Sequence, residues 1–331
     1  MKLAIFDTHR FERPIFEQLN GQFGHELTFF DPRLTEETAR LATGFPVVCA
    51  FANDRLNEKV LTLLKLEGVK LVALRSAGFN HVDLKAAGRL GLKVVRVPAY
   101  SPHAVAEHAI ALALALNRKI CRANARVRDL NFSLDGLVGF DFFGKTAGII
   151  GTGRIGSVLV KIMTGFGCRV LAHDPTPNQE LTKQTGVNYV RLDELFKNAD
   201  LISLHLPLLP STRHLINAQA LACMKPGVML INTGRGALID TQALIESLKS
   251  GHIGSAGLDV YEEEEGIFFQ DLSESVLQDD VLARLLTFPN VLITSHQAFL
   301  TREALGSIVE TTLQNIRDFE QSKPLVNEVR A

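Results

Sequence analysis

Short apolar runs alternate with helix-like stretches along roughly the first hundred residues. These runs are rich in Val, Leu, Ile and Phe and lack the polar alternation of a half-exposed strand, which is typical of parallel strands buried on both faces. Five such runs occur, at residues 2–6, 26–30, 47–51, 70–74 and 93–97. The pattern predicts a first α/β domain whose parallel strands are joined by helices.

A second series of apolar runs again alternates with helical segments. Six runs occur, at residues 147–150, 169–173, 200–205, 228–232, 255–259 and 291–294. Strands with helical crossovers suit a doubly wound parallel sheet, so we expect an α/β protein with two Rossmann-like domains. The last helix, over residues 302–319, is expected to return to the first domain. Residues 1–100 and 300–331 would then form one discontinuous domain, with residues 101–299 inserted as the second.

A long apolar helix is expected between the two series, over residues 103–130. It follows a hinge at Tyr100, which Pro98 and Pro102 flank. The helix carries more hydrophobic surface than the core of one domain needs, and large apolar patches commonly mark interfaces. We expect it to pack against a second copy of the chain, in a homodimer or a homotetramer.

The composition is that of a globular protein with a small-molecule partner. Of 331 residues, 46% are hydrophobic and 21% are charged, and 35 basic against 36 acidic side chains leave a net charge of −1. This balance offers no basic patch for nucleic acid or for a membrane surface. The most membrane-like run, residues 109–116, is much shorter than a membrane span requires. A small molecule is therefore the expected partner.

The cysteines argue against a metal site and against a disulfide framework. Cys49, Cys121, Cys168 and Cys223 are far apart, and no Cys-x-x-Cys pair occurs. A reducing, cytoplasmic location fits this usage, and no metal is expected.

A glycine-rich turn follows the first strand of the second series. Gly151, Gly153 and Gly156 have the spacing G-x-G-x-x-G and open an amphipathic helix. The first glycine permits a tight turn, the second lets the backbone approach a pyrophosphate, and the third allows close helix–strand packing. The helix N-terminus, which includes Arg154 and Ile155, offers N–H donors to the phosphate charge. The motif predicts a dinucleotide site.

The next strand ends at Asp174, eighteen residues after Gly156. A carboxylate at this position would accept hydrogen bonds from the hydroxyls of the adenosine ribose and repel a 2′-phosphate. NAD is therefore favoured over NADP, although Arg154 and His173 leave some tolerance of NADP open.

Four segments carry polar residues at or near the ends of predicted strands: residues 75–83, 232–240, 257–264 and 294–296. In order and spacing they resemble the D-isomer-specific 2-hydroxyacid dehydrogenases, and the resemblance covers nearly the whole chain. Within that family the likeness is strongest to the fermentative D-lactate dehydrogenases, at residues 97–102, 144–148, 259–264 and 296–300. The resemblance implies a substrate domain, an inserted NAD-binding domain, and reduction of a small 2-oxo acid.

Three of the matching residues suit that chemistry. Reducing a 2-oxo acid with NADH needs a cation for the substrate carboxylate and a proton donor for the developing alkoxide. Arg235 can grip a carboxylate bidentately, and His296 can donate the proton because imidazole titrates near neutral pH. By the family's spacing, Glu264 pairs with His296 and keeps it protonated while the oxo acid binds. The other three glutamates of the run 262–265 are expected to be solvated.

The resemblance also implies cofactor contacts beyond the glycine turn. Asp259 is expected to contact the nicotinamide carboxamide or ribose. Further candidates line the adenine and nicotinamide pockets: Leu206, Pro207, Thr212, Thr233 and Gly234. His205 is expected to pack near the site and not to act as an acid.

Two loops of the first domain are expected to hold the substrate carboxylate. Ala77 and Gly78 would offer backbone N–H groups, because a glycine lets the backbone approach a ligand closely. Arg75 is expected to add positive charge. The resemblance implies a further hydrogen bond from Tyr100.

Phe51 and Phe299 would close around the methyl group of the substrate, and such bulk favours pyruvate over longer 2-oxo acids. Taken with these residues, the resemblance implies an NAD-dependent D-lactate dehydrogenase that reduces pyruvate. A reductase of bulkier 2-oxo acids, such as phenylpyruvate or 2-oxoisocaproate, is the nearest alternative. An NAD-sensing interaction protein is the other, because this fold also serves transcriptional corepressors that keep the Arg, Glu and His residues.

Overall fold

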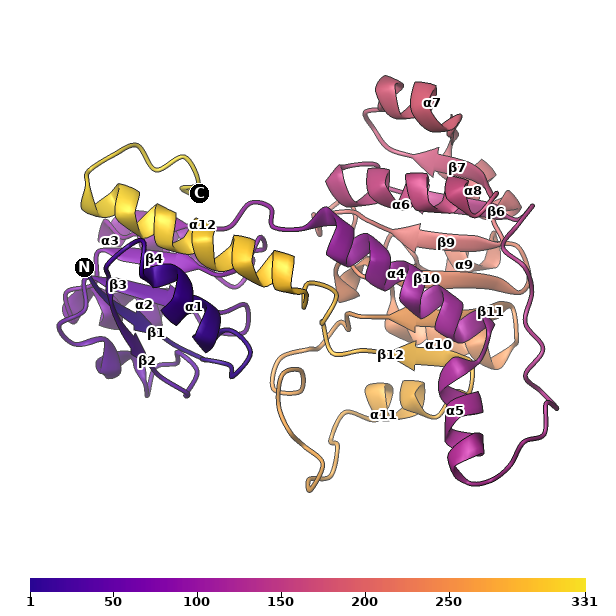
Figure 1. Ribbon diagram of the computed structural model, residues 1–331, viewed down its shortest axis with the longest axis horizontal. Helices are drawn as coiled ribbons and strands as arrows, with labels where there is room; N and C mark the ends of the chain where they lie inside the picture. The colour runs from indigo at the N-terminus through magenta and orange to yellow at the C-terminus, as the bar shows by residue number, and fades with distance from the viewer. The chain divides into compact units, whose positions relative to one another are not determined.

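The computed structural model describes every residue, Met1–Ala331, and divides into two compact units (Figure 1). Unit 1 comprises Met1–Ser101 and Leu300–Ala331, and unit 2 comprises Pro102–Phe299. Each unit is built on its own sheet, and every strand pairs with its neighbours in parallel. The predicted α/β class with parallel sheets is confirmed.

The sheet of unit 1 has five strands in the order β2-β1-β3-β4-β5. Its central strands are buried on both faces, which explains why their sequences lack polar alternation. The strands are β1 (Lys2–Ile5), β2 (Glu26–Phe29), β3 (Val47–Ala50), β4 (Leu71–Leu74) and β5 (Lys93–Val95).

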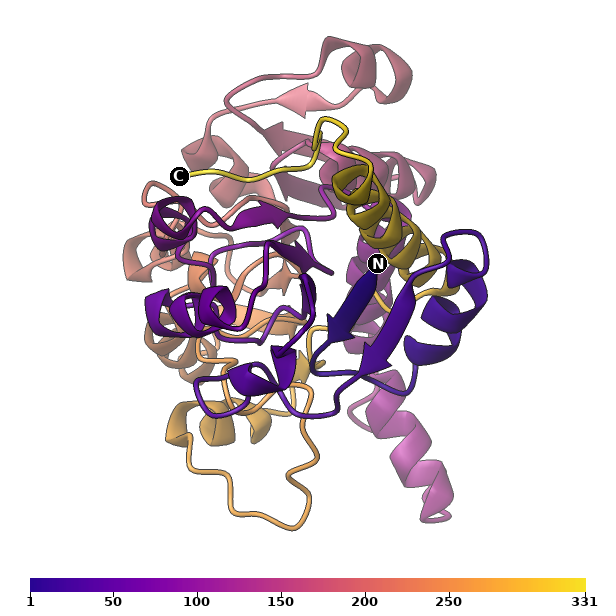
Figure 2. The same cartoon turned by 90° about the vertical axis from the view of Figure 1, so that its left-hand side faces the viewer.

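Helices from both ends of the chain pack on this sheet. The N-terminal segment supplies α1 (Arg13–Asn20), the 3-10 turn η1 (Ala39–Ala42), α2 (Glu58–Leu66) and α3 (Leu84–Leu90). The C-terminal helix α12 (Arg302–Glu320) lies beside α1 and packs on β4 (Figure 2). Val309, Leu313 and Ile316 of α12 share a core with Phe16 of α1. Helix α12 therefore belongs to unit 1, although all of unit 2 separates it in sequence from the rest of that unit.

The sheet of unit 2 has seven strands in the order β12-β11-β10-β9-β6-β7-β8. They are β6 (Thr146–Ile150), β7 (Arg169–His173), β8 (Asn188–Tyr189), β9 (Leu201–Leu204), β10 (Val228–Asn232), β11 (Ile253–Leu258) and β12 (Val291–Ile293). The six predicted runs all form strands. The edge strand β8 was missed because two residues are too few for a periodic pattern.

The helices of unit 2 are α4 (Pro102–Asn117), α5 (Ile120–Arg128), α6 (Arg154–Gly165), α7 (Gln179–Thr185), α8 (Leu192–Asn198), α9 (Ala218–Ala222), α10 (Thr241–Lys249) and α11 (Asp280–Leu286). A 3-10 turn, η2 (Gly236–Leu238), follows β10. None of these helices, nor any in unit 1, combines the length and the apolar character needed to cross a membrane.

The prediction of a single helix over residues 103–130 is wrong in one respect. It is divided into α4 and α5 at Lys119, whose backbone adopts a left-handed conformation with φ +51°. Helix α4 packs on α6, β10 and β11 of its own unit, so its apolar side chains belong to the local core. Helix α5, in contrast, has no buried residue. The surplus hydrophobic surface therefore lies on α5 and the segment after it, and not on α4.

Candidate functional site

The candidate residues of unit 2 lie where its strands end. Leu206 and Pro207 follow β9, Arg235 follows β10, and His296 follows β12. Because the carboxyl ends of parallel strands meet at one edge of a sheet, this edge gathers the polar residues that the sequence scatters over the chain. Ligands of doubly wound folds bind at this edge.

His296 and Glu264 form a hydrogen-bonded pair. Nδ1 of His296 lies 2.8 Å from Oε2 of Glu264, while Oε1 of Glu264 accepts the N–H of Tyr261 at 3.0 Å. A carboxylate accepts and does not donate, so Nδ1 carries a proton and Nε2 is the nitrogen that can exchange one with a substrate. The imidazole side chain is 25% exposed, which leaves it open to a ligand.

Asp259 holds the loop on which His296 sits. Its carboxylate is fully buried and accepts hydrogen bonds from the Thr294 hydroxyl at 2.5 Å and from the N–H groups of Gln297 and Ala298 at 2.9 Å. The N–H of His296 donates to the carbonyl oxygen of Asp259 at 2.7 Å. These bonds keep His296 at a left-handed φ of +55°, which a non-glycine residue adopts only with support from its surroundings. The expected contact between Asp259 and nicotinamide stays a prediction.

His108 on α4 is a member of this cluster that the sequence pattern did not reveal. Its Nε2 lies 3.3 Å from Oδ1 of Asp259 and 3.1 Å from the hydroxyl of Thr294. Burial alone would raise the pKa of Asp259, but the hydrogen bonds from His108, Thr294 and the loop N–H groups hold this pKa below its ordinary value. No spacing rule could have linked His108 to Thr294, since 186 positions separate them.

Arg235 lies on a turn that its neighbours hold rigidly. The side chain of Asn232 accepts the N–H of Gly234 at 3.0 Å and donates to the carbonyl oxygen of Arg235 at 2.9 Å. Gly236 is required at the next position, because an added Cβ would lie 1.9 Å from the carbonyl oxygen of Tyr261. The half-buried guanidinium of Arg235 makes one hydrogen bond to the protein, to the carbonyl oxygen of Gly234 at 2.7 Å. Its remaining donors are therefore available to a carboxylate.

Glu262 is not solvated, contrary to the expectation for its glutamate run. Its side chain is 16% exposed and contacts His214 Nε2 at 2.6 Å and Arg213 at 3.2 Å, while Thr241 donates to it at 3.3 Å. Glu262 therefore ties the loop after β9 to the segment that carries Glu264. The sequence did not reveal this role, because nothing in a run of four glutamates distinguishes its members.

The glycine-rich turn after β6 has the geometry that a dinucleotide needs. Gly151 has φ +90°, and an added Cβ would lie 2.3 Å from the carbonyl oxygen of His205. A Cβ on Gly156 would lie 1.9 Å from the carbonyl oxygen of Gly151, whereas a Cβ on Gly153 would meet nothing within 4 Å. The first and third glycines are thus required by packing. The second leaves open space beside the N-terminus of α6, which begins at Arg154 and Ile155.

Asp174 follows β7 and anchors the glycine turn. Its Oδ2 accepts the N–H of Thr152 at 2.7 Å and the Thr152 hydroxyl at 3.2 Å, and Oδ1 accepts the N–H of Thr176 at 2.8 Å. The hydroxyl of Tyr189 on β8 donates to Thr152 at 2.9 Å. The carboxylate is therefore held beside the turn, and its contact with the adenosine ribose stays a prediction.

The remaining cofactor candidates lie on the loops after β9 and β10. Thr212 closes a turn by donating to the carbonyl oxygen of Pro207 at 2.7 Å and accepting the N–H of Leu209 at 2.8 Å. The hydroxyl of Thr233 is buried without a hydrogen-bond partner in the protein. Because an unsatisfied buried hydroxyl is costly, this atom fits a site where a ligand supplies the partner. Together with the open space at Gly153, it shows that the residues present fit a dinucleotide.

Unit 1 has a second group of candidates at the carboxyl ends of β3 and β4. Neither the N–H of Ala77 nor that of Gly78 donates a hydrogen bond to the protein, whereas the carbonyl oxygens of the two residues accept from Arg96 and Ser76. This arrangement suits the expected binding of a carboxylate by the two N–H groups. Half-buried Tyr100 lies near the end of the first segment of unit 1, and half-buried Phe299 ends unit 2. The roles of both residues toward a substrate stay predictions.

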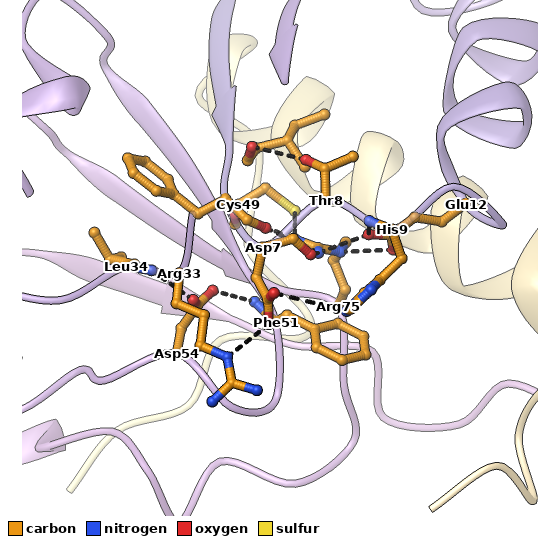
Figure 3. A network of polar contacts seen from close by, with 12 residues as sticks. Asp7, Thr8, His9, Glu12, Arg33, Leu34, Cys49, Phe51, Asp54 and Arg75 are labelled. Carbon is orange, nitrogen blue, oxygen red and sulfur yellow. Dashed lines mark hydrogen bonds and ion pairs between the residues drawn. The ribbon is translucent and has the colours of Figure 1, made fainter. Parts of the chain in front are cut away.

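The expectation that Arg75 adds positive charge for the substrate carboxylate is wrong. Its guanidinium is fully buried and donates to both carboxylate oxygens of Glu12, at 2.8 and 3.0 Å (Figure 3). It also donates to the carbonyl oxygens of Phe6 at 3.0 Å, Asp7 at 3.1 Å and Cys49 at 3.3 Å. Burial would lower the pKa of Arg75, but the Glu12 carboxylate raises it, so the guanidinium stays charged. Arg75 is a structural residue that joins the ends of β1, β3 and β4.

His205 should make the free energy of unfolding depend on pH. Its Nε2 lies 2.9 Å from the hydroxyl of Ser203, and burial lowers the pKa of the ring from 6.5 to about 4. Below pH 6.5 the unfolded chain binds a proton that the folded protein excludes, so the free energy of unfolding should fall as the pH drops toward 4. The loss should reach up to about 3 kcal/mol, since tenfold in proton affinity corresponds to about 1.4 kcal/mol.

His205→Gln should make this loss smaller, as measured by urea unfolding at about pH 7.5 and about pH 5. His103→Gln, at an exposed histidine of α4, should leave the loss unchanged. An equal pH dependence in wild type and His205→Gln would contradict the assignment.

Comparison with known proteins is consistent with this geometry. The family model for the NAD-binding domain of D-isomer specific 2-hydroxyacid dehydrogenases matches residues 110–298. The D-lactate dehydrogenase of Escherichia coli strain K12 is 56% identical over 329 residues, which is 99% of this chain and 100% of that protein.

Two solved structures have the same fold. The apo-structure of D-lactate dehydrogenase from Escherichia coli has a TM-score of 0.92 at 54% identity and covers 99% of this chain and 100% of its own. The pyruvate reductase of Chlamydomonas reinhardtii has a TM-score of 0.94 at 46% identity, covering 99% of this chain and 98% of its own. The chain belongs to the D-isomer specific 2-hydroxyacid dehydrogenases, a family of NAD-dependent oxidoreductases, and NAD is its cofactor.

Proposed function

We propose that this chain is a D-lactate dehydrogenase that reduces pyruvate to D-lactate. The observation that carries the proposal is the His296–Glu264 pair, whose nitrogen and oxygen are 2.8 Å apart, on the same sheet edge as an arginine with unused donors. This arrangement provides a proton donor and a carboxylate clamp. The relatives named D-lactate dehydrogenase and pyruvate reductase support pyruvate as the substrate.

The proposed reaction adds a hydride and a proton across the carbonyl of pyruvate. NADH, when bound, supplies the hydride to C2. His296 transfers a proton from Nε2 to the carbonyl oxygen as negative charge develops there, and Glu264 stabilises the protonated imidazole and fixes its orientation. Arg235 grips the carboxylate bidentately and so holds the carbonyl carbon in place. In the reverse direction His296 accepts the hydroxyl proton of D-lactate.

The proposal assigns further substrate contacts to Phe51, Ala77, Gly78, Tyr100 and Phe299. The free N–H groups of Ala77 and Gly78 bind the carboxylate, and Tyr100 adds a hydrogen bond. Phe51 and Phe299 border the methyl group. Such a pocket discriminates against an added methylene by about 1 to 3 kcal/mol, so pyruvate is preferred but bulkier 2-oxo acids are not fully rejected.

The proposal includes a homo-oligomer. Helix α5 has no buried residue, and the segment after it exposes Leu130, Phe132, Leu134, Val138 and Phe143. Leu134 and Val138 are 79% and 84% exposed, respectively. Exposed side chains of this size, so close together in sequence, are typical of an interface. A second copy of the chain is the proposed partner for this surface.

The substrate assignment is tested by following NADH oxidation with pyruvate, phenylpyruvate and 2-oxoisocaproate in parallel, with chiral analysis of the product. We expect the highest kcat/KM with pyruvate and D-lactate as the product. A higher kcat/KM with phenylpyruvate would move the assignment to bulkier substrates. NADH binding without turnover of any 2-oxo acid would favour an NAD-sensing protein.

The catalytic roles are tested by His296→Ala and Arg235→Gln. His296→Ala should lower kcat by roughly 10²- to 10⁴-fold, because it removes the proton donor. Arg235→Gln should raise KM for pyruvate and also lower kcat, because it removes a bidentate cation. Glu263→Gln is the matched control, since Glu263 lies in the same glutamate run but is exposed, and it should behave as wild type. Near-wild-type kinetics in either catalytic variant would refute its assignment.

The oligomer is tested by sedimentation at micromolar concentration. Wild type should sediment as a dimer or a tetramer, and the double variant Leu134→Ser, Val138→Ser should shift toward the monomer. Leu66→Ser, at an equally exposed leucine of α2 in unit 1, should not change the distribution. A monomeric wild type would contradict the proposal.

A further inference from the structure

The loop after β3 is closed by a buried carboxylate that the reaction chemistry does not use. Asp54 is 1% exposed. Its Oδ2 accepts the N–H of Phe51 at 2.6 Å, and its Oδ1 accepts the N–H of Leu34 at 2.7 Å (Figure 3). Leu34 also accepts the N–H of Arg55 at 3.0 Å through its carbonyl oxygen. One side chain therefore joins the loop after β3 to the loop after β2.

The chemistry of this position favours a carboxylate over its neutral isostere. Burial raises the pKa of Asp54 to about 7, and the two N–H donors and the charge of Arg75 oppose this rise. Asparagine would have a similar size but only one acceptor atom for two N–H donors. One buried side chain that accepts N–H groups from two loops at once therefore fixes those loops relative to each other.

The ring of Phe51 is held as firmly as its backbone. The guanidinium of Arg75 lies over the ring, 5.1 Å from its centroid, and the ring of His9 packs edge-on at 5.0 Å. Arg75 is itself fixed by Glu12 and by three carbonyl groups. Phe51 is thus constrained at its N–H by Asp54 and at its ring by Arg75 and His9, all within unit 1.

We propose that Asp54 is a positioning residue for substrate selection, which acts by holding Phe51 at the edge of the substrate pocket. The inference rests on the proposed function, in which Phe51 borders the methyl group of pyruvate. Asp54 touches neither substrate nor cofactor. Its effect on the reaction passes through the position of Phe51, and should therefore appear in the affinity for pyruvate and in the discrimination against larger 2-oxo acids.

The test is a double-mutant cycle with Asp54→Asn and Phe51→Ala. Asp54→Asn should lower kcat/KM for pyruvate by about 10- to 100-fold, the size expected when a binding group is misplaced by about 1 Å. The loss should appear in KM for pyruvate, while KM for NADH stays unchanged. The ratio of kcat/KM for phenylpyruvate to that for pyruvate should rise. In the Phe51→Ala background, Asp54→Asn should cause no further loss.

The control is Asp31→Asn, because Asp31 is an exposed carboxylate on the loop after β2 that also carries Leu34. It should behave as wild type. Three results would overturn the inference: wild-type kinetics in Asp54→Asn, equal changes in KM for pyruvate and for NADH, or additive losses in the double variant. A merely structural role for Asp54 would produce the second or the third result.

A measurement on the wild-type protein keeps the inference testable if Asp54→Asn does not fold. The N–H of Phe51 should be protected from hydrogen exchange although it lies just beyond the end of β3. Exchange as fast as in the exposed segment 130–138 would overturn the inference. Turnover of pyruvate by the wild-type protein separates the two proposals. If the wild type does not turn over pyruvate, the proposed function fails. If it does, and Asp54→Asn has the same kinetics as wild type, only the positioning role is rejected.

Discussion

The buried carboxylate of Asp259 is the group on which the candidate active site depends most. It accepts hydrogen bonds from Thr294, Gln297 and Ala298, with His108 close by. A buried carboxylate must find such donors, because an unsatisfied charge in the interior is strongly unfavourable. The chain around His296 therefore follows the path that brings these donors together, even though His296 must adopt a left-handed backbone. His296 is placed by a requirement for hydrogen bonding and not by its own packing.

In unit 1, too, buried charged groups must find hydrogen-bond partners, and different residues supply them. The Arg75–Glu12 pair joins the ends of three strands, and Asp54 joins two loops. Polar groups gather at this edge because strand ends leave backbone groups that must be paired by side chains. Buried ionic groups of this kind are costly to disrupt singly, since removing one partner leaves the other unpaired. Both sheets therefore use buried charge to give their loops a fixed shape.

The predictions that succeeded rest on local signals, and the failures have identifiable causes. Buried strands and the glycine turn are visible over a few residues, since each repeats a short pattern or a fixed spacing. The break at Lys119 was missed because the residues after it still have helical character. Arg75 was misread because its partner Glu12 is 63 positions away. Glu262 was misread because its contacts with Arg213, His214 and Thr241 come from other loops.

The sequence by itself determined the α/β class, the parallel sheets and the glycine turn. These features depend on hydrophobic periodicity and on local backbone requirements, which neighbouring residues carry. Only the tertiary structure decided which charges are buried and which remain free to bind a ligand. Arg75 and Arg235 both follow strands. The guanidinium of Arg75 is hydrogen-bonded to Glu12 and to backbone carbonyl oxygens, whereas that of Arg235 keeps N–H donors that bind no protein group. The difference arises because the loops at a sheet edge come from distant parts of the chain, so the partners of each side chain are set when the strands assemble.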